Sequence, residues 1–300
     1  FDFRGDVGES ILYDLIKQSE FNWLTSNVRW VPNVVGNDFN ALDNLKNSKI
    51  IEIGGMSVGI FGLTLDSNPT TYAEIDGAFI DHARLEISEL KGQGATFIIG
   101  LTHLFINDDV GLMQALGKDR PDLIIGGHEH MRIMESIEGS TIYKADSDLE
   151  SIAKITVSGD GITSGTYIAL DGAIAKDPVM EQAIGRWFDR YYADMCGAPS
   201  GEECPDKTLG TSLVELSALS TNIRRYETNT GNWIADVMRA TYKNDGADIA
   251  FINSGAIRIN RNITVDEPIT AGLSGELLPY DPKTFLIEIT GTDLVDIVKQ

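Results

Sequence analysis

The sequence predicts an α/β fold divided into two domains. Its 300 residues, 42% of them hydrophobic, exceed the length of a typical single domain. Near-continuous apolar segments of strand length alternate with amphipathic helical segments, which is typical of a sheet covered on both faces. A segment rich in Cys, Gly and Pro, MCGAPSGEECP at 195–205, interrupts this alternation and marks the expected domain boundary.

The first half of the chain alternates strands and helices. KIIEIGGMSVGIFGLT (49–64) predicts two strands joined by a tight Gly-Gly turn. The segment at 72–95 has the apolar spacing of a helix that ends at a glycine. Further strands are predicted at 96–103, 122–127, 140–148 and 151–162, with a short helix at 109–121.

The second half alternates again. DPVMEQAIGRWFDRYYADM (177–195) has apolar residues at helical spacing, and TGNWIADVMRATYK (230–243) predicts a second helix. ADIAFINSG (247–255) and FLIEITG (285–291) predict strands. A last helix is expected over 292–300, with Thr292 as its cap.

The charge balance restricts the partners. Asp and Glu number 45 against 24 Lys and Arg, for a formal net charge of −21. Such a field repels nucleic acid and anionic membranes, so neither is expected as a partner. No window has the eighteen apolar residues of a membrane span, so membrane attachment would need an anchor outside this chain. A phosphate-binding site must therefore be built locally, from metals or a few arginines. Oligomeric state is not indicated.

The two cysteines, Cys196 and Cys204, lie in the boundary segment. A local disulfide between them would indicate an oxidising compartment. Two free thiols on a loop are the other interpretation, and the residues leave both open.

Three of the four histidines follow apolar strands. His103 ends one predicted strand, and His128 and His130 follow the next one after Gly-Gly. Ligand sites of open α/β sheets gather at the carboxyl ends of strands, and neutral imidazole is a common metal ligand. On an extended strand His128 and His130 would share a face, whereas on a turn they could reach adjacent metals. Three histidines so placed predict a metal site.

A local cationic spot is predicted downstream. Asn253 and Gly255 lie at the end of a predicted strand, Arg258 follows it, and Arg224 precedes a helix. A glycine beside an Asn at a strand end allows close approach of the backbone to a ligand. Arginine offers a bidentate fork to phosphate or sugar oxygens.

These motifs resemble those of a known family. GGHEH is similar to the GGHxH of the calcineurin-like metallophosphoesterases, LTH to their earlier His ligand, and the opening FD to the end of their GNHEFD motif. RRYETNTGNWIADVM, ADIAFINSGAIR and LLPY resemble, in order, the substrate-domain motifs of the 5'-nucleotidases. The resemblance covers nearly the whole chain.

The resemblance implies a four-layer α-β-β-α metallophosphoesterase domain in 1–176, joined by a linker helix and hinge in 177–206 to a second α/β, nucleotide-binding domain in 207–300. The family's upstream series of D-x-H, G-D and G-N-H-E motifs is absent from this sequence. We therefore expect that both ends are truncated, and that the remaining metal ligands and the catalytic His lie upstream.

The resemblance also implies roles for single residues. His103 and His128 would bind one metal, His130 would bind the other, and Asp2 would orient the catalytic His. Arg224, Asn253, Gly255 and Arg258 would contact the phosphate, ribose or base region. Tyr280 stands where the family usually has a Phe that stacks on the base; it keeps the aromatic face and adds a hydroxyl. Ser254 replaces a Gly of the usual N-G-G, which is a mild change.

The function implied is hydrolysis of nucleotide phosphate esters with two divalent metal ions (Zn, Mn, Fe or Co), releasing nucleoside and phosphate. A relative that hydrolyses UDP-sugars, dinucleotides or 2',3'-cyclic nucleotides is one alternative, and a non-catalytic nucleotide-binding protein is another. The family and the cysteine pair imply an extracellular, periplasmic or cell-surface location.

Overall fold

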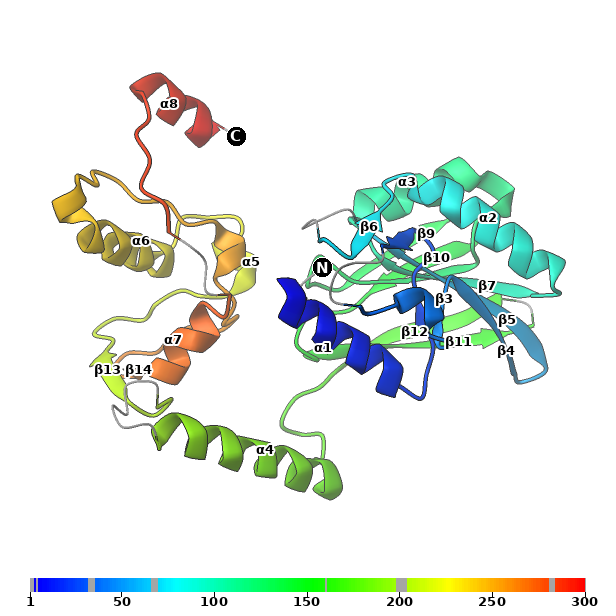
Figure 1. The fold of residues 1–300 in the computed structure, drawn as a ribbon, viewed down its shortest axis with the longest axis horizontal. Helices are drawn as coiled ribbons and strands as arrows, with labels where there is room; N and C mark the ends of the chain where they lie inside the picture. Colours follow the sequence, from blue (N-terminus) through cyan, green and yellow to red (C-terminus); the bar gives the residue numbers. More distant parts are fainter. Residues whose placement is uncertain are drawn as a thin grey trace. The chain divides into compact units, whose positions relative to one another are not determined.

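The computed structural model describes residues 3, 5–31, 36–65, 70–159, 161–197, 204–280 and 284–299. The chain divides into two compact units, a first unit of residues 1–175 and a second unit of residues 176–300. Figure 1 draws both, and each is described here by itself. Asp2 lies outside the described residues.

The first unit contains three α-helices and twelve strands among its described residues. The helices are α1 (Gly5–Gln18), α2 (Phe79–Gly92) and α3 (Ile106–Leu116). The strands are β1 (Trp23–Leu24), β2 (Val28–Trp30), β3 (Leu45–Lys46), β4 (Ser48–Ile53), β5 (Met56–Thr64), β6 (Ala73–Ile75), β7 (Phe97–His103), β8 (Leu123–Gly126), β9 (Ile133–Ile137), β10 (Ser140–Lys144), β11 (Ser151–Ser158) and β12 (Gly161–Ala169).

A six-stranded sheet forms the centre of the described first unit, in the order β4-β5-β7-β8-β10-β9. β5, β7, β8 and β10 pair in parallel, while β4 and β9 pair antiparallel at the two edges. The predicted Gly-Gly turn between β4 and β5 is confirmed, with Gly54 at φ 60° and Gly55 at φ 80°. Two successive positive φ values suit a two-residue hairpin loop, which glycine adopts without a Cβ penalty.

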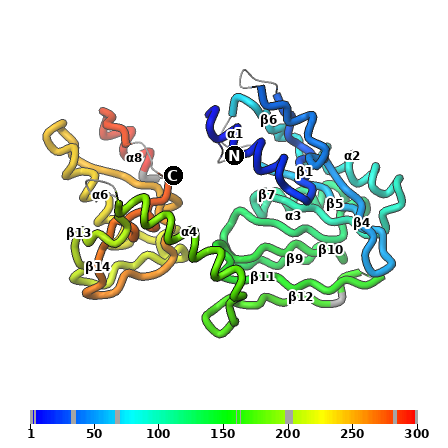
Figure 2. Tube along the Cα trace, turned by 60° about the horizontal axis from the view of Figure 1, so that its bottom comes forward, coloured from blue at the N-terminus to red at the C-terminus, as the bar shows by residue number. Residues whose placement is uncertain are grey.

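Two apolar cores cover the two faces of this sheet. On one face, buried residues of α2 and α3, including Ile87, Leu90 and Leu112, pack against Phe61 and Ile98. On the other face, the β11–β12 hairpin packs against a core that includes Val58, Phe97, Leu123 and Tyr143. Figures 1 and 2 show the helices and the hairpin on opposite sides of the sheet. The sheet is buried on both faces, as its continuous apolar strands predict.

Helix α1 and the short β1–β3 pair complete the layers. Leu12 and Ile16 of α1 are buried in a cluster with aromatic residues, against which Trp23 of β1 and Leu45 of β3 pack. β1 also lies against the central sheet, because a Cβ added at Gly62 of β5 would clash with the carbonyl oxygen of Leu24. The described elements thus form the expected four-layer α-β-β-α arrangement, with α1 outermost on one side and α2 and α3 on the other.

The second unit is smaller and mainly helical in its described part. Its elements are α4 (Pro178–Cys196), β13 (Thr208–Thr211), α5 (Ser220–Ile223), α6 (Asn229–Thr241), β14 (Pro268–Thr270), α7 (Ala271–Leu277) and α8 (Gly291–Lys299). β13 and β14 pair antiparallel. The core comprises two clusters, one around Ile223, Ile234 and Leu277 and one around Leu216 and Ile263.

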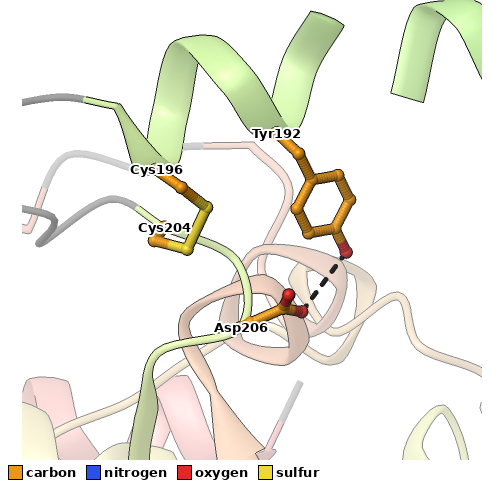
Figure 3. Close-up of a disulfide and its surroundings, with 4 residues drawn as sticks. All are labelled: Tyr192, Cys196, Cys204 and Asp206. Atoms are coloured by element: carbon orange, nitrogen blue, oxygen red, sulfur yellow. Dashed lines mark hydrogen bonds between the residues drawn. A yellow bond between two sulfur atoms is a disulfide. The ribbon is translucent and has the colours of Figure 1, made fainter. Parts of the chain in front are cut away.

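Helix α4 and the cysteine pair lie at the start of the second unit. Asp177 caps α4 by accepting from the backbone N–H groups of Val179 and Met180, and a proline opens the helix. Cys196 and Cys204 form a disulfide that ties the end of α4 to the segment before β13 (Figure 3). The disulfide alternative is therefore the correct one. No helix among the described residues is long and apolar enough to cross a membrane.

Four predictions of local structure are wrong. The segments 247–253 and 285–290 are not strands, because neither pairs with another described segment and a strand needs a ladder partner. The helix expected from residue 72 begins at Phe79, and Ala73–Ile75 is strand β6 paired with β2. The last helix is preceded by Thr290 rather than capped at Thr292, since Thr290 and Asp293 exchange the reciprocal bonds of a capping box.

Candidate functional site

The structure brings two of the predicted metal-binding histidines together. His103 is the last residue of β7, and His128 lies two residues after the end of the adjacent strand β8. Their rings meet edge to face with centroids 5.3 Å apart, and the Phe105 ring contacts His128 from 4.3 Å. The carboxyl edge of the parallel sheet therefore gathers the imidazoles as predicted.

The segment that carries His128 and His130 is a turn and not an extended strand. His128 has φ 85° and His130 has φ 59°, so both lie in the left-handed region. For residues other than glycine this conformation costs about 1–2 kcal/mol each. Surrounding contacts must hold such a backbone in place, and residues of this kind concentrate at functional sites.

The Gly-Gly pair before the histidines permits tight packing. A Cβ at Gly127 would lie 3.3 Å from Nδ1 of His103. A Cβ at Gly126 would lie 2.9 Å from Cε of Lys144 and 3.0 Å from Oγ1 of Thr102. A Cβ at Gly126 would therefore require its neighbours to shift, and one at Gly127 would be tighter than most real Cβ contacts.

His103 is set up to stay neutral. Partial desolvation at the strand end lowers its pKa, and the positive potentials of His128, His130 and Lys144 lower it further. A neutral imidazole has a lone pair available at neutral pH, as an acceptor or as a metal ligand.

A pocket of about 280 Å³ opens beside His103 on the face of the sheet opposite the helices. Leu101 and Ile125 form part of its floor and are 39% and 40% exposed, so the β11–β12 hairpin does not extend over them. The lining residues are Leu24, Thr25, Leu63, Thr64, Leu101, Thr102, His103 and Ile125. Its position at the carboxyl ends of β5 and β7 is where ligands bind in such sheets.

Within the described residues, the histidines provide only part of a metal site. No group of three His, Cys, Asp or Glu side chains that could hold a metal ion occurs in the described part of the chain. The His103 and His128 pair offers the imidazole nitrogen donors that Zn, Mn, Fe or Co accept. Completion of a site would require further ligands, so the described residues alone do not fit a bound metal.

A buried charged cluster behind the turn was not found from the sequence. Lys144 at the end of β10 is 1% exposed, and its ammonium lies 2.7 Å from Glu129 Oε2 and 2.8 Å from Asp109 Oδ2. Burial raises the pKa of Asp109, against the opposing effect of Lys144. The available signal was the lysine at the end of STIYK within a predicted strand, together with the Glu between the two histidines.

In the second unit, two of the predicted substrate residues meet at a glycine. A Cβ added at Gly255 would lie 3.2 Å from Nδ2 of Asn253 and 3.8 Å from Nη1 of Arg224. Asn253 is extended just before the short turn of residues 254–256, and Arg224 ends α5. The open side of Gly255 is thus flanked by an amide and a guanidinium, and both side chains belong to exposed residues.

Arg258 and Tyr280 form a second pair close by along the chain. The Arg258 guanidinium carbon lies 5.1 Å from the centroid of the Tyr280 ring, within cation–π range. The backbone N–H of Arg258 donates to the carbonyl of Leu277, which brings the two segments together. Tyr280 is 56% exposed, so part of its ring is accessible to a ligand.

A larger hollow of about 900 Å³ in the second unit does not include these residues. Aromatic side chains of α4 and residues of α7 line it. Tyr192 donates to Asp206 there at 3.4 Å, and this carboxylate raises the pKa of Tyr192 (Figure 3). The candidate substrate site is therefore located by the contacts among the predicted substrate-binding residues and not by the larger cavity.

Comparison with known proteins relates both units to nucleotidases. Residues 208–300 match the family model described as 5'-nucleotidase, C-terminal domain. The trifunctional nucleotide phosphoesterase protein YfkN of Bacillus subtilis (strain 168) is 25% identical over 270 residues, which are 84% of this chain and 17% of that protein. The snake venom 5'-nucleotidase of Naja atra is 22% identical over 329 residues, covering 95% of this chain and 58% of its own length.

A solved structure supports the same fold. The 5'-nucleotidase precursor from Thermus thermophilus aligns with a TM-score of 0.69 at 22% identity, over 89% of this chain and 55% of the other. The chain thus spans between about a sixth and three fifths of the length of these proteins. It has the two-domain α/β fold of the 5'-nucleotidases, and its residues 208–300 match the model of the 5'-nucleotidase C-terminal domain.

Proposed function

We propose that the protein hydrolyses phosphate esters of nucleotides and releases a nucleoside and phosphate. The observation that carries the proposal is the convergence of Arg224 and Asn253 on Gly255 within the segment that matches the 5'-nucleotidase C-terminal domain. A guanidinium and an amide beside an open glycine can bind the oxygens of a phosphate or a ribose. In a chain of net charge −21, this spot is a local exception suited to an anion.

The second unit would provide substrate recognition. The accessible part of the Tyr280 ring offers a stacking surface for a base, and the Arg258 guanidinium at 5.1 Å supports the ring. Exposed Arg224 and Asn253 would contact the sugar or phosphate. Residues 177–206 are proposed as the linker and hinge between the domains, with the boundary at 176/177.

The first unit would provide the chemistry. His103 and His128 would hold one divalent metal ion and His130 another, together with ligands outside the described residues, and Asp2 would orient a catalytic histidine. Bound metals supply Lewis-acid stabilisation of phosphoryl oxygens. The part that this chain supplies is neutral imidazole, because the lowered pKa of His103 keeps its lone pair available.

The test is phosphate release from AMP, UDP-glucose and NAD by the full-length protein, with and without a chelator. Arg224→Ala should raise KM for the preferred substrate, while Arg225→Ala is the matched control: the neighbouring exposed arginine loses the same charge. Equal effects of the two variants would show that net charge, and not the Gly255 spot, governs binding. Three substrates are needed because the Bacillus relative is named a trifunctional nucleotide phosphoesterase.

A non-catalytic nucleotide-binding protein is the second candidate. The observation that favours it is the lack of a three-ligand metal group among the described residues. Binding of AMP measured by calorimetry, with no phosphate released from any of the three substrates, would establish this alternative.

We also propose an extracellular, periplasmic or cell-surface location. The Cys196–Cys204 disulfide supports it, because disulfides persist in oxidising compartments. The snake venom relative is consistent with it. Thiol labelling of protein isolated from its native source tests the proposal, since both thiols would react if the compartment were reducing.

A further inference from the structure

A buried lysine lies directly behind the histidine turn. Lys144 is 1% exposed, and its ammonium has three oxygen neighbours: the Leu104 carbonyl at 2.7 Å, Glu129 Oε2 at 2.7 Å and Asp109 Oδ2 at 2.8 Å. Two of the three N–H donors of the ammonium group form hydrogen bonds, to the Leu104 carbonyl and to Glu129, and Asp109 is an ion-pair partner. Hydrogen bonds together with an opposite charge are what a buried ammonium requires.

The three oxygens belong to the segments that carry the histidines or adjoin them. Leu104 follows His103 directly, and Glu129 separates His128 from His130. Asp109 is fully buried on α3, the helix that begins just after β7. One ammonium therefore joins the end of β7, the turn after β8 and the first turn of α3.

Glu129 is anchored at both oxygens. Oε2 accepts from Lys144, and Oε1 accepts from the backbone N–H of Ile106, the first residue of α3. The residues on either side of Glu129 have positive φ values, 85° for His128 and 59° for His130. The anchored Glu129 carboxylate thus lies between two residues whose backbone conformations are unfavourable and would change if nothing held them.

A role in stability alone does not account for this placement. A buried ion cluster can often be replaced by apolar residues of similar volume without loss of stability. Here the contacts connect the two segments whose imidazoles meet at 5.3 Å. The relative position of His103 and His128 follows from where Leu104 and Glu129 are held.

We propose that Lys144, acting through Glu129 and the Leu104 carbonyl and braced by Asp109, is a positioning residue for the His103 and His128 pair. The role of that pair in phosphate ester hydrolysis rests on the proposed function. The positioning of the two rings by Lys144 does not depend on the proposed function. Lys144 and Glu129 hold the rings in place without themselves touching the substrate.

The test uses imidazole ¹H–¹⁵N correlation spectra of the protein carrying Glu129→Gln. This variant keeps the size of the side chain but gives one anchored oxygen position an NH₂ group, which cannot accept from Lys144 or Ile106. With four histidines in the chain, each signal can be followed. His82 on α2, which contacts Asp76 at 3.0 Å, is the internal reference.

The expected result is that the His103, His128 and His130 signals shift or split while the His82 signal stays. Glu135→Gln is the matched control, since it removes the same charge from an exposed position on β9 and should leave all four signals unchanged. A lower melting temperature with all four histidine signals at wild-type positions would overturn the proposal, because the cluster would then serve stability only. Lys144→Met gives a second variant with the same expected pattern.

Kinetics of the full-length protein separates this proposal from the proposed function. Glu129→Gln should lower kcat for AMP by about 10- to 100-fold with little change in KM, the size found for residues that orient metal ligands. An unchanged kcat would overturn the positioning role. If the wild-type protein releases no phosphate while the histidine signals still move in Glu129→Gln, the proposed function fails and the positioning role stands.

Discussion

Replacement of Tyr280 by alanine separates nucleotide recognition from phosphate chemistry. Tyr280 is 56% exposed and its described ring contact is with Arg258, so its removal should cost little stability. An exposed cation–π pair contributes about 0.5–1 kcal/mol, which bounds the expected loss. We therefore predict a folded Tyr280→Ala protein whose defect lies in binding.

The expected binding defect follows from loss of base stacking. A stacked base contributes roughly 1–3 kcal/mol by alanine substitution, which corresponds to about a 5- to 150-fold rise in KM for AMP. Tyr280→Phe keeps the ring and should remain close to the wild-type protein. An aryl phosphate that does not use the base site should be hydrolysed at an unchanged maximal rate.

Steady-state kinetics with AMP and an aryl phosphate measures both effects. His128→Ala should depress hydrolysis of both substrates together, because its imidazole is proposed to act on the phosphoryl group that they share. Tyr280→Ala and His128→Ala must therefore give different substrate patterns. If Tyr280→Ala lowered the rates for both substrates equally, or for neither, Tyr280 would not stack on a base and the nucleotide assignment would reduce to an unspecified phosphoesterase.

Four further predictions follow from individual contacts. Gly255→Ala should weaken AMP binding in calorimetry while the melting temperature changes little, because the new Cβ lies 3.2 Å from Nδ2 of Asn253; wild-type affinity would contradict the recognition role. Reduction of Cys196–Cys204, which are eight residues apart, should lower the free energy of unfolding by about 2–3 kcal/mol in the loop-entropy model, and denaturant melts with and without reductant measure it. Hydrogen bonds lower the pKa of Glu267 to about 2 from 4.5, so its stabilising effect should be present above pH 4.5 and decline as the pH falls towards 2. Glu267→Gln should therefore destabilise the protein at pH 7 and have little effect at pH 2. The 300-residue chain by itself should bind Zn²⁺ or Mn²⁺ weakly, and tight stoichiometric binding in calorimetry would show that the chain completes a site unaided.

The sequence by itself determined the elements whose signal is local. The Gly-Gly hairpin at 48–64, the buried strands β7 and β8, helices α4 and α6, and the existence of α2 though not its start follow from apolar spacing and local residue types. It also determined that His103 and His128 follow parallel strands, and therefore that they come to the same edge of the sheet. This inference succeeds because strand direction in an α/β sheet brings carboxyl ends together wherever the strands lie in the chain.

Only the tertiary structure decided the features that depend on distant neighbours. Residues 247–253 have the composition of a strand but find no partner among the described residues, and a strand exists only as part of a ladder. Whether His128 lies on a strand or a turn was open in the sequence, and its φ of 85° is held by contacts from other elements. From its sequence neighbours alone, Lys144 is a polar residue within a predicted strand. Its function as a link appears only when Leu104, Asp109 and Glu129 are brought to it, because the energy of a buried charge depends on its partners in space and not on its neighbours in sequence.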